Sequence, residues 1–470
     1  MQSNIAFVGL FPYKQLPLAR RLEADGLRVH WVVRWRSEAE FLRQAGVPAD
    51  RVLDTSEIDP SRGDPEVYVP ALAGLEFDGA PRMNELVLSD RHLRRKDRDF
   101  CIRYLGEVER RVTEFLRRHE VQVVTTVNDT ALQILTMSIC MRDGVAVVNP
   151  AKVRLPLERW GFFTSRFYER LVPVREPSPQ DYASARALLA EFRDRGAKVA
   201  FWATESRLRD LLSYLPRQLA FVRKAAAWSR HDRSVRHTRW TLVDLARMYA
   251  AKRRNLVWLR AARPYITAPG TRPFVLYALH MQPESTIDVL GAYFSNQLEL
   301  IRNVARATPV THDVYVKVHA GDVGGHPPAF YRALAQIPNV RIVAPEVSSR
   351  ALVQQAGAVL TVSGTIAYEA GLLGRPAITF ARMYFNDLPT VRRCESPTAL
   401  PELLRELLEG PPPPDADERA VEFLARMYAW SFPGEHNRLT RELTPTELDD
   451  VAGAYRALMA HLRPPAEVAA

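Results

Sequence analysis

The 470-residue chain has few cysteines and no long apolar run. These two absences limit the classes of protein to which it can belong. Its three cysteines, Cys101, Cys140 and Cys394, lie far apart and form no CxxC pair, which argues against a disulfide framework and a structural zinc site. No stretch approaches the roughly 20 apolar residues that a membrane-spanning helix needs. The start, "MQSNIAFVGLF", has no basic segment before its hydrophobic run, so we interpret it as a first strand and not as a signal peptide. We therefore expect a cytoplasmic protein.

Aromatic residues are also scarce, at 9%, but a hydrophobic share of 47% and a charged share of 25% are ordinary for a globular protein. The chain exceeds the roughly 100–200 residues of one domain, so two or three domains are expected. Acids are scarce in one stretch, since residues 207–263 hold fifteen Lys or Arg and three acids, a net charge of +12 against +10 for the whole chain. An anionic partner should therefore meet the middle of the chain.

Short apolar runs alternate with helical patterns in two parts of the chain. Residues 1–175 begin with "NIAFVGL" and "RVHWVV", and residues 265–410 run from "PFVLYAL" to "PAITF" and beyond. The alternation predicts parallel strands joined by helices, hence an α/β protein with two doubly wound, Rossmann-like domains that face a cleft. We expect residues 176–264 to form a helical basic insertion and residues 411–470, which start at a proline run, to form a helical tail.

The second domain carries a polar turn at the end of a strand, which is where ligands of such sheets bind. In "VLTVSGTIAYEAGLL", the strand stops at Ser363-Gly364-Thr365 and a helix begins. The unpaired N–H groups of a helix start, with two hydroxyls beside them, favour a phosphate, and Glu369 one turn later can bind a ribose. A plain helix cap followed by a solvated glutamate is an equally good interpretation.

Two further motifs follow strands of the second domain. In "VYVKVHAGD", strand alternation places Lys317 and His319 on one face near the carboxyl end, where the histidine could bind phosphate or protonate a leaving group. A structural histidine is the more frequent case. In "LHMQPESTID", a proline-fixed turn presents Gln282 and Glu284, which suits substrate binding or an ordinary loop.

The first domain offers one candidate, in "TTVNDTALQ", where Asn128 and Asp129 lie between a strand and a helix. Asp129 could act as a general base, although capping of the following helix is the more frequent role. His280 and Arg154 are weaker polar candidates.

The three motifs of the second domain occur together and in order, and here the sequence resembles bacterial capsule and surface-polysaccharide biosynthesis proteins. These are related to Kdo-transferase-like glycosyltransferases of GT-B architecture, with two Rossmann domains. The resemblance also rests on "SS" before a helix (Ser348, Ser349), on "LGRPAITF" and on "RMYFNDLP", and it covers residues 270–395 well. Family members usually carry His-Pro where this chain has His319-Ala320.

The resemblance implies that the second domain binds a CMP- or UDP-type nucleotide-sugar donor. His319 and the turn at residues 363–365 would hold the nucleotide phosphate, and Glu369 the ribose. The expected donor site comprises Gln282, Glu284, Lys317, His319, Ser348, Ser349, Ser363, Gly364, Thr365 and Glu369.

We expect His319 and Asp129 to be the catalytic residues. Negative charge builds on the nucleotide as the sugar–phosphate bond breaks, and N–H groups, Lys317 and His319 could stabilise it. No acidic DxD cluster follows a strand, so we expect no metal, and we expect no cofactor. Asp129 would accept the proton of the acceptor hydroxyl.

The basic stretch has two interpretations. In "RQLAFVRKAAAWSR", Phe221 and Trp228 lie seven residues apart, as do Arg217 and Lys224, which suits an amphipathic helix on an anionic membrane surface or glycan. A helical arm with a solvated basic face is equally plausible. No nucleic-acid-binding module is recognisable, so we expect no nucleic acid partner.

The leading hypothesis is a cytoplasmic glycosyltransferase, peripheral at the inner membrane if the basic stretch binds lipid. It would transfer a sugar from a nucleotide donor to a surface or capsular polysaccharide or to its lipid-linked precursor. The alternatives are a nucleotide-sugar 2-epimerase-like isomerase and a catalytically degenerate polysaccharide-assembly subunit.

Overall fold

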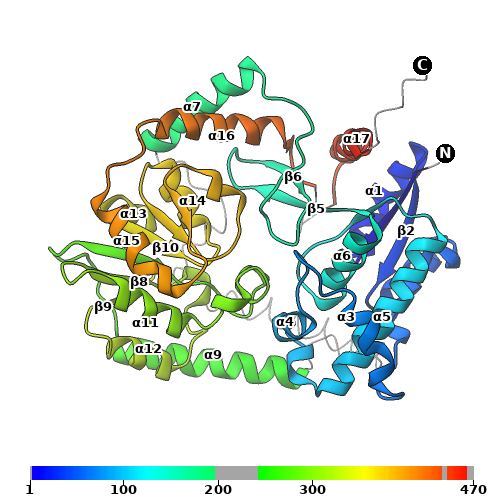
Figure 1. The fold of residues 1–470 in the computed structure, drawn as a ribbon, viewed down its shortest axis with the longest axis horizontal. Coiled ribbons are helices and arrows are strands. Elements are labelled where there is room, and N and C mark those ends of the chain that lie inside the picture. The colour runs from blue at the N-terminus through cyan, green and yellow to red at the C-terminus, as the bar shows by residue number, and fades with distance from the viewer. Residues whose placement is uncertain (1–2, 196–241, 437–441, 463–470) are drawn as a thin grey trace.

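The structure is a computed structural model that describes residues 3–195, 242–436 and 442–462. In this part of the chain the strands form two sheets, each the centre of an α/β domain (Figure 1). The predicted fold class, two Rossmann-like domains with substantial helix, is confirmed.

The first sheet has seven strands in the order β13-β6-β5-β4-β1-β2-β3. Five of them, from β5 to β3, pair in parallel, as the alternation of strands and helices predicts. The other two pairings, β5 with β6 and β6 with β13, are antiparallel. The strands are β1 (Asn4–Val8), β2 (Arg28–Val33), β3 (Val52–Asp54), β4 (Val123–Thr125), β5 (Ala146–Val153), β6 (Arg159–Phe163) and β13 (Phe432–Pro433).

Helices cover both faces of the first sheet, which is why its strands read as continuous apolar runs. Ile5 and Phe7 of β1 belong to one core, and Ala6 and Val8 belong to another, because successive side chains of a strand point to opposite faces. The helices are α1 (Pro12–Ala24), α2 (Arg36–Gln44), α3 (Val69–Ala73), α4 (Met83–Ser89), α5 (Arg98–Arg118) and α6 (Ala131–Asp143).

The second sheet has six parallel strands in the order β12-β11-β10-β7-β8-β9. Its strands are β7 (Phe274–Ala278), β8 (Asp313–Lys317), β9 (Val340–Val343), β10 (Ala358–Thr361), β11 (Ala377–Thr379) and β12 (Val391–Arg393), and its helices are α10 (Ser285–Asp288), α11 (Gln297–Ala307), α12 (Pro328–Ala335), α13 (Ser349–Gln355), α14 (Thr365–Leu372) and α15 (Leu400–Glu409).

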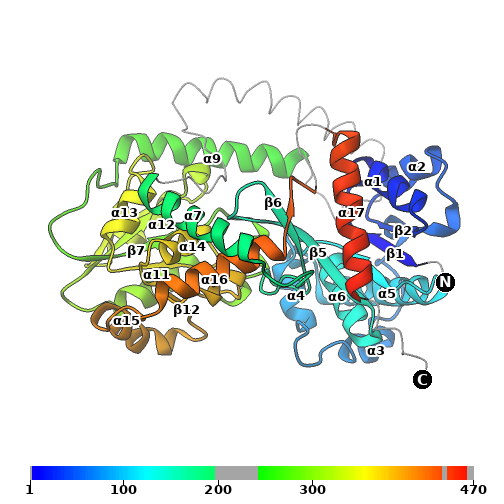
Figure 2. The ribbon, with the colours of Figure 1, turned by 90° about the horizontal axis from the view of Figure 1, so that it is seen from above.

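The helices expected to form an insertion and a tail pack on the two domains. Helices α7 (Pro179–Arg195) and α16 (Ala416–Ala429) lie side by side (Figures 1 and 2) and contribute to the core of the second domain. Helix α17 (Pro445–Leu462) returns to the first domain and packs on α1 (Figure 2). The domain boundaries at residues 175, 264 and 410 stay a prediction. The helix predicted around Phe221 and Trp228 lies outside the described residues.

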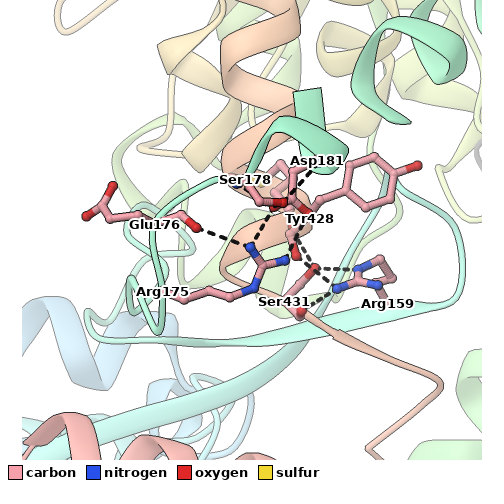
Figure 3. Close-up of polar contacts among 8 residues, drawn as sticks. Arg159, Arg175, Glu176, Ser178, Asp181, Tyr428 and Ser431 are labelled. Atoms are coloured by element: carbon pink, nitrogen blue, oxygen red, sulfur yellow. Dashed lines mark hydrogen bonds and ion pairs between the residues drawn. The ribbon is translucent and has the colours of Figure 1, made fainter. Parts of the chain in front are cut away.

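Polar contacts join the two segments that cross between the domains (Figure 3). The Arg159 guanidinium in β6 donates to Ser431 Oγ at 2.8 Å and to the Tyr428 carbonyl at 2.9 Å, at the end of α16. Nearby, Arg175 pairs with Asp181 at 2.6 Å, just inside α7. The outgoing and returning segments are therefore fastened to each other where they pass.

Replacing Leu458 in α17 with alanine is expected to lower the free energy of unfolding by about 2–5 kcal/mol, because the side chain is fully buried in the core of the first domain. Denaturant unfolding followed by tryptophan fluorescence measures the loss. His461→Ala, at an exposed position of the same helix, is the matched control. A loss for Leu458→Ala no larger than that of the control would mean that α17 does not contribute to the domain.

Candidate functional site

The three sequence motifs of the second domain lie on adjacent loops. They follow β7, β8 and β10, and these strands are neighbours in the sheet, with β7 between the other two. Parallel strands end at the same edge, so the loops of "QPE", "VHA" and "SGT" meet there. The predicted grouping of these motifs agrees with the strand order.

The Ser363 side chain is occupied within the protein. Its Oγ donates to the Thr286 carbonyl at 2.6 Å, its backbone N–H donates to His280 Nε2 at 3.1 Å, and only 4% of the residue is exposed. Ser363 therefore ties the turn to the loop of α10, which is a different role from the predicted phosphate contact.

Gly364 is the N-cap of α14, and Thr365 is the first residue of the helix. The φ of Gly364 is −70°, so no left-handed conformation requires a glycine. The requirement is steric, because a Cβ at this position would lie 2.6 Å from Thr361 Oγ1. The N–H groups of a helix start lack partners in the helix, so this turn remains suited to an anion.

His280, a weak candidate in the sequence, is the buried centre of this edge. Its Nε2 accepts from the Ser363 N–H and lies 3.0 Å from Thr361 Oγ1, while its backbone N–H donates to Gln297 Oε1 at 2.8 Å. Burial, with a contribution from the nearby His319, lowers the pKa of His280 to about 3. The ring is therefore neutral and structural at neutral pH.

Gln282 is also engaged in the protein framework. Its Nε2 donates to Asp288 Oδ1 at 3.1 Å and to the Ser295 carbonyl at 3.0 Å, and its Oε1 accepts from Gln297 Nε2 at 3.0 Å. A pocket of about 490 Å³ lies beside it, with His326 and Phe330 among the lining residues. Gln282 fixes the shape of the loop that presents Glu284.

Glu284 faces charges of the first domain. Burial raises the pKa of its carboxyl, and the positive charges of Arg154 and Arg91 act in the opposite direction. Arg91 also donates to Asp129 Oδ1 at 2.5 Å. The Arg91–Asp129 ion pair and Arg154 of the first domain thus act electrostatically on Glu284 of the second.

Asp129 does not cap α6, although capping is the more frequent role for an aspartate before a helix. Thr130 caps α6 and forms a capping box with Gln133, so the Asp129 side chain is left for Arg91. The Arg91 guanidinium binds the Oδ1 of Asp129. If Asp129 acts as a general base, its Oδ2 is the atom that accepts the proton.

Lys317 and His319 have different surroundings, although alternation predicted one face for both. Lys317 is 5% exposed, and its Nζ donates to the carbonyls of Ala344 at 3.1 Å and Pro345 at 2.7 Å, at the end of β9. Burial lowers its pKa to about 8. Its ammonium group therefore joins two strand ends, and the expected contact with a donor phosphate does not follow from this geometry.

His319 stands where β8 has ended. Its Nδ1 accepts from the Gly321 N–H at 3.1 Å, so the proton of the neutral ring is on Nε2. Burial and the charge of Lys317 lower its pKa below the ordinary 6.5. At neutral pH the side chain is an uncharged donor.

The remaining predicted residues lie on α13 and α14, which pack against each other. Ser348 caps α13, its Oγ accepting from the Ala351 N–H at 3.4 Å, and Ser349 is the first residue of the helix. Burial raises the pKa of Glu369 to about 7, against the influence of Arg350 on α13. Glu369 is therefore close to the start of α13, and it takes up a proton near neutrality.

Neither a cluster of metal ligands nor a membrane-spanning helix is present in residues 3–195, 242–436 and 442–462. No group of three or more His, Cys, Asp or Glu in these ranges could hold a metal ion. None of the helices described there combines the length and the apolar character needed to cross a membrane.

A family model described as "Capsule polysaccharide biosynthesis protein" matches residues 186–388. The match confirms the resemblance to capsule polysaccharide biosynthesis proteins. It spans less than half of the chain and includes β7 to β11 with all three motifs. No curated protein matches the sequence.

Among solved structures, the chain is similar to a UDP-GlcNAc 2-epimerase of Neisseria meningitidis bound to UDP-GlcNAc, with 14% identity, coverage of 98% of this chain and 99% of that one, and a TM-score of 0.29. KpsC of Thermosulfurimonas dismutans, a beta Kdo 2,7 transferase, gives 10% identity, coverage of 74% and 89%, and a TM-score of 0.33. MurG of Acinetobacter baumannii gives 12% identity, coverage of 97% and 99%, and a TM-score of 0.29. TM-scores this low do not establish a shared function.

The hydrogen bonds of Ser363 change what its substitution should do. Ser363→Ala is expected to lower the free energy of unfolding by about 1–2 kcal/mol, because the Thr286 carbonyl loses a buried partner. Thr365→Ala, at the half-exposed helix start, is expected to weaken nucleotide binding with little effect on stability. Thermal unfolding and nucleotide titration of both variants compare the two effects, and a reversed pattern would contradict the assignment.

Proposed function

We propose that the chain is a glycosyltransferase that transfers a sugar from a nucleotide-sugar donor to a capsular polysaccharide or its lipid-linked precursor. The observation that carries the proposal is the meeting of three polar loops at one edge of the second sheet, within the segment that matches the capsule family. The facing charges of the first domain, Arg91 and Arg154, support a site shared by both domains.

The roles follow from the chemistry of each group. The helix start at Gly364-Thr365 and the Nε2–H of His319 would bind the nucleotide phosphate, where negative charge grows as the glycosidic bond breaks. The neutral His319 ring can donate this hydrogen bond, and the bond becomes stronger as the negative charge on the phosphate grows. Glu369 would bind the ribose, since a carboxyl group accepts bonds from two hydroxyls.

Two acids are available for the acceptor. Asp129 retains the role of general base in this proposal, with Arg91 holding its carboxylate in place at 2.5 Å. Glu284, with its raised pKa, lies near Arg91 and Arg154 and would orient the acceptor or the donor sugar. We propose a metal-independent reaction, because the charge on the leaving nucleotide can be met by N–H donors.

We further propose that the protein works in the cytoplasm at an anionic membrane surface and does not bind nucleic acid. Support comes from α9 (Leu242–Ala262), whose exposed residues include Arg253, Arg254 and Arg260 with the apolar Val257. Co-sedimentation with phosphatidylglycerol vesicles, compared with phosphatidylcholine vesicles and with duplex DNA, tests this part.

The experiment that tests the function has two stages. Thermal unfolding of the full chain with CMP, UDP and GDP should show stabilisation by one nucleotide, about 2.7 kcal/mol when the ligand is at 100 times its Kd. Mass spectrometry then follows transfer from the matching nucleotide sugar to an added glycan acceptor. Formation of an epimer without acceptor would favour the isomerase, and absence of both binding and turnover would leave only an assembly subunit.

A further inference from the structure

The loop that carries His319 has little regular structure of its own. It runs from the end of β8 to α12 and closes one tight turn, in which the Asp322 N–H donates to the His319 carbonyl at 2.9 Å. A second bond links the Gly325 N–H to the Asp322 carbonyl at 2.8 Å. These bonds shape the turn, but they do not fix its place relative to the sheet.

Helix α9 supplies that fixed point. Asn255, 3% exposed, donates from Nδ2 to the Gly324 carbonyl at 3.0 Å. One turn earlier, Lys252 Nζ lies 3.5 Å from the Gly321 carbonyl and 4.0 Å from Asp322 Oδ1. The helix thus holds the loop by polar contacts at both ends of the turn.

The contact between loop and helix is also close in the steric sense. Gly324 has a φ of +84°, which favours glycine, and a Cβ there would lie 2.7 Å from Leu256 Cγ and 2.9 Å from the Lys252 carbonyl. The loop backbone therefore rests directly on α9.

The same turn reaches the neighbouring loop. Asp322 is 7% exposed, and its carboxylate accepts a bond from the Gln282 backbone N–H. Its other surroundings are Lys252 on α9, and His326, whose Nε2 lies 3.9 Å from Oδ2. A displacement of the turn would thus be felt by two of the three loops of the site.

We propose that Asn255 is a positioning residue that sets the imidazole of His319 through its hydrogen bond to the Gly324 carbonyl. Its amide is buried, so the bond is shielded from water and its loss is not replaced by solvation. The helix also reaches the first domain, where Asp244 and Arg95 lie 3.5 Å apart (Figure 1). The catalytic meaning of this role rests on the proposed function, whereas the structural link between Asn255 and His319 does not.

The link is tested by the titration of His319 in the full chain. Histidine labelled with 13C at Cε1 gives a signal for each of the eleven histidines, and the signal that disappears in His319→Ala belongs to His319. Asn255→Leu keeps the branched shape of the side chain and removes the hydrogen bond. Because burial and Lys317 hold the pKa of His319 low, a loosened loop should raise its midpoint toward 6.5.

Val257→Ala is the matched control, since Val257 is 63% exposed on the same helix, and its midpoint should equal that of the wild type. An unchanged midpoint in folded Asn255→Leu would overturn the proposal. Should Asn255→Leu not fold, Asn255→Ala, which removes the amide without adding a charge, takes its place in the same measurement.

The enzymatic arm separates this inference from the proposed function. Asn255→Leu is expected to lower kcat/KM for the donor about tenfold with the KM for the acceptor unchanged, and Asn255→Gln should restore part of the loss. A shifted His319 midpoint in a protein that transfers no sugar would keep the positioning role and reject the glycosyltransferase. Equal falls in kcat/KM for donor and acceptor, in step with lost thermal stability, would reject the positioning role.

Discussion

Replacing His319 with asparagine is expected to lower kcat/KM for sugar transfer by about 10²–10³-fold, the range over which one preorganised hydrogen-bond donor to a developing negative charge contributes to catalysis. The Oδ1 of asparagine can replace the imidazole Nδ1 as acceptor for the Gly321 N–H, now 3.1 Å away. The loop should therefore keep its shape, while the donor at Nε2 is lost. The measurement is the initial rate of transfer against donor concentration.

His319→Ala is the companion variant, because it removes both the donor and the loop contact. If the Nε2–H carries the catalysis, the two variants should have similar rates and differ in stability only. If His319→Asn instead retains the wild-type rate, the imidazole serves the loop alone. At saturating donor, the rate of the wild type should fall only below pH 6.5, since the pKa of His319 is lowered from that value and the neutral ring is the active form.

The regular part of the fold could be predicted from the sequence, because each parallel strand leaves a local apolar signal. Strands such as "FVLYA" and "VYVK" are buried on both faces and need no knowledge of the rest of the chain. The sequence patterns do not reveal β6, β12 and β13: β12 and β13 are short and lie at a sheet edge, and β6 pairs antiparallel with β5 outside the alternation of strands and helices. β13 has two residues and forms only because the chain returns from the second domain.

The direction of side chains at the strand ends could not be predicted in the same way. Alternation assigns Lys317 and His319 to one face only while the strand continues, and β8 ends at Lys317. Beyond that point the backbone turns. The Lys317 ammonium group binds the carbonyls of Ala344 and Pro345, which lie 27 and 28 positions later in the sequence. Ser363 is a similar case, since its partners on the β7 side are about 80 positions away.

The charged residues that act on one another between the domains could not be predicted from a local sequence pattern. Asp129 and Glu284 are 155 positions apart in the sequence. The chain is rich in arginine, so nothing in the sequence distinguishes Arg91 and Arg154 from the others. What could have been recognised is Thr130, because Thr-x-x-Gln in "TALQ" is a capping-box pattern and removes Asp129 from that role.

Replacing Glu369 with glutamine is expected to make the free energy of unfolding rise, relative to that of the wild type, between pH 4.5 and pH 7. Burial raises the pKa of this carboxyl from 4.5 to about 7. A group whose pKa is raised in the folded state contributes its stability fully below the unfolded pKa and loses it as pH rises through the folded one. The difference amounts to roughly 3 kcal/mol.

Denaturant unfolding at intervals between pH 4 and pH 8 measures this slope. Asp322, with a pKa raised by burial to about 6, and His280, with a pKa lowered by burial, add slopes of opposite sign to both proteins, so the difference between the two proteins reports Glu369. Glu406→Gln, at an exposed position of α15, should leave the whole slope unchanged. The same slope in Glu369→Gln as in the wild type would show that folding does not raise the pKa of this carboxyl.

The protonation of Glu369 should also be coupled to nucleotide binding. If ribose hydroxyls donate to an ionised Glu369, nucleotide binding must lower the pKa of the carboxyl, and by linkage the affinity must rise with pH. Below pH 7 the increase approaches tenfold per pH unit, and each binding event releases up to one proton. Calorimetric titration in two buffers of different ionisation enthalpy counts the protons. Glu369→Gln should release none, whereas proton release that persists in this variant would assign the ribose contact to another group.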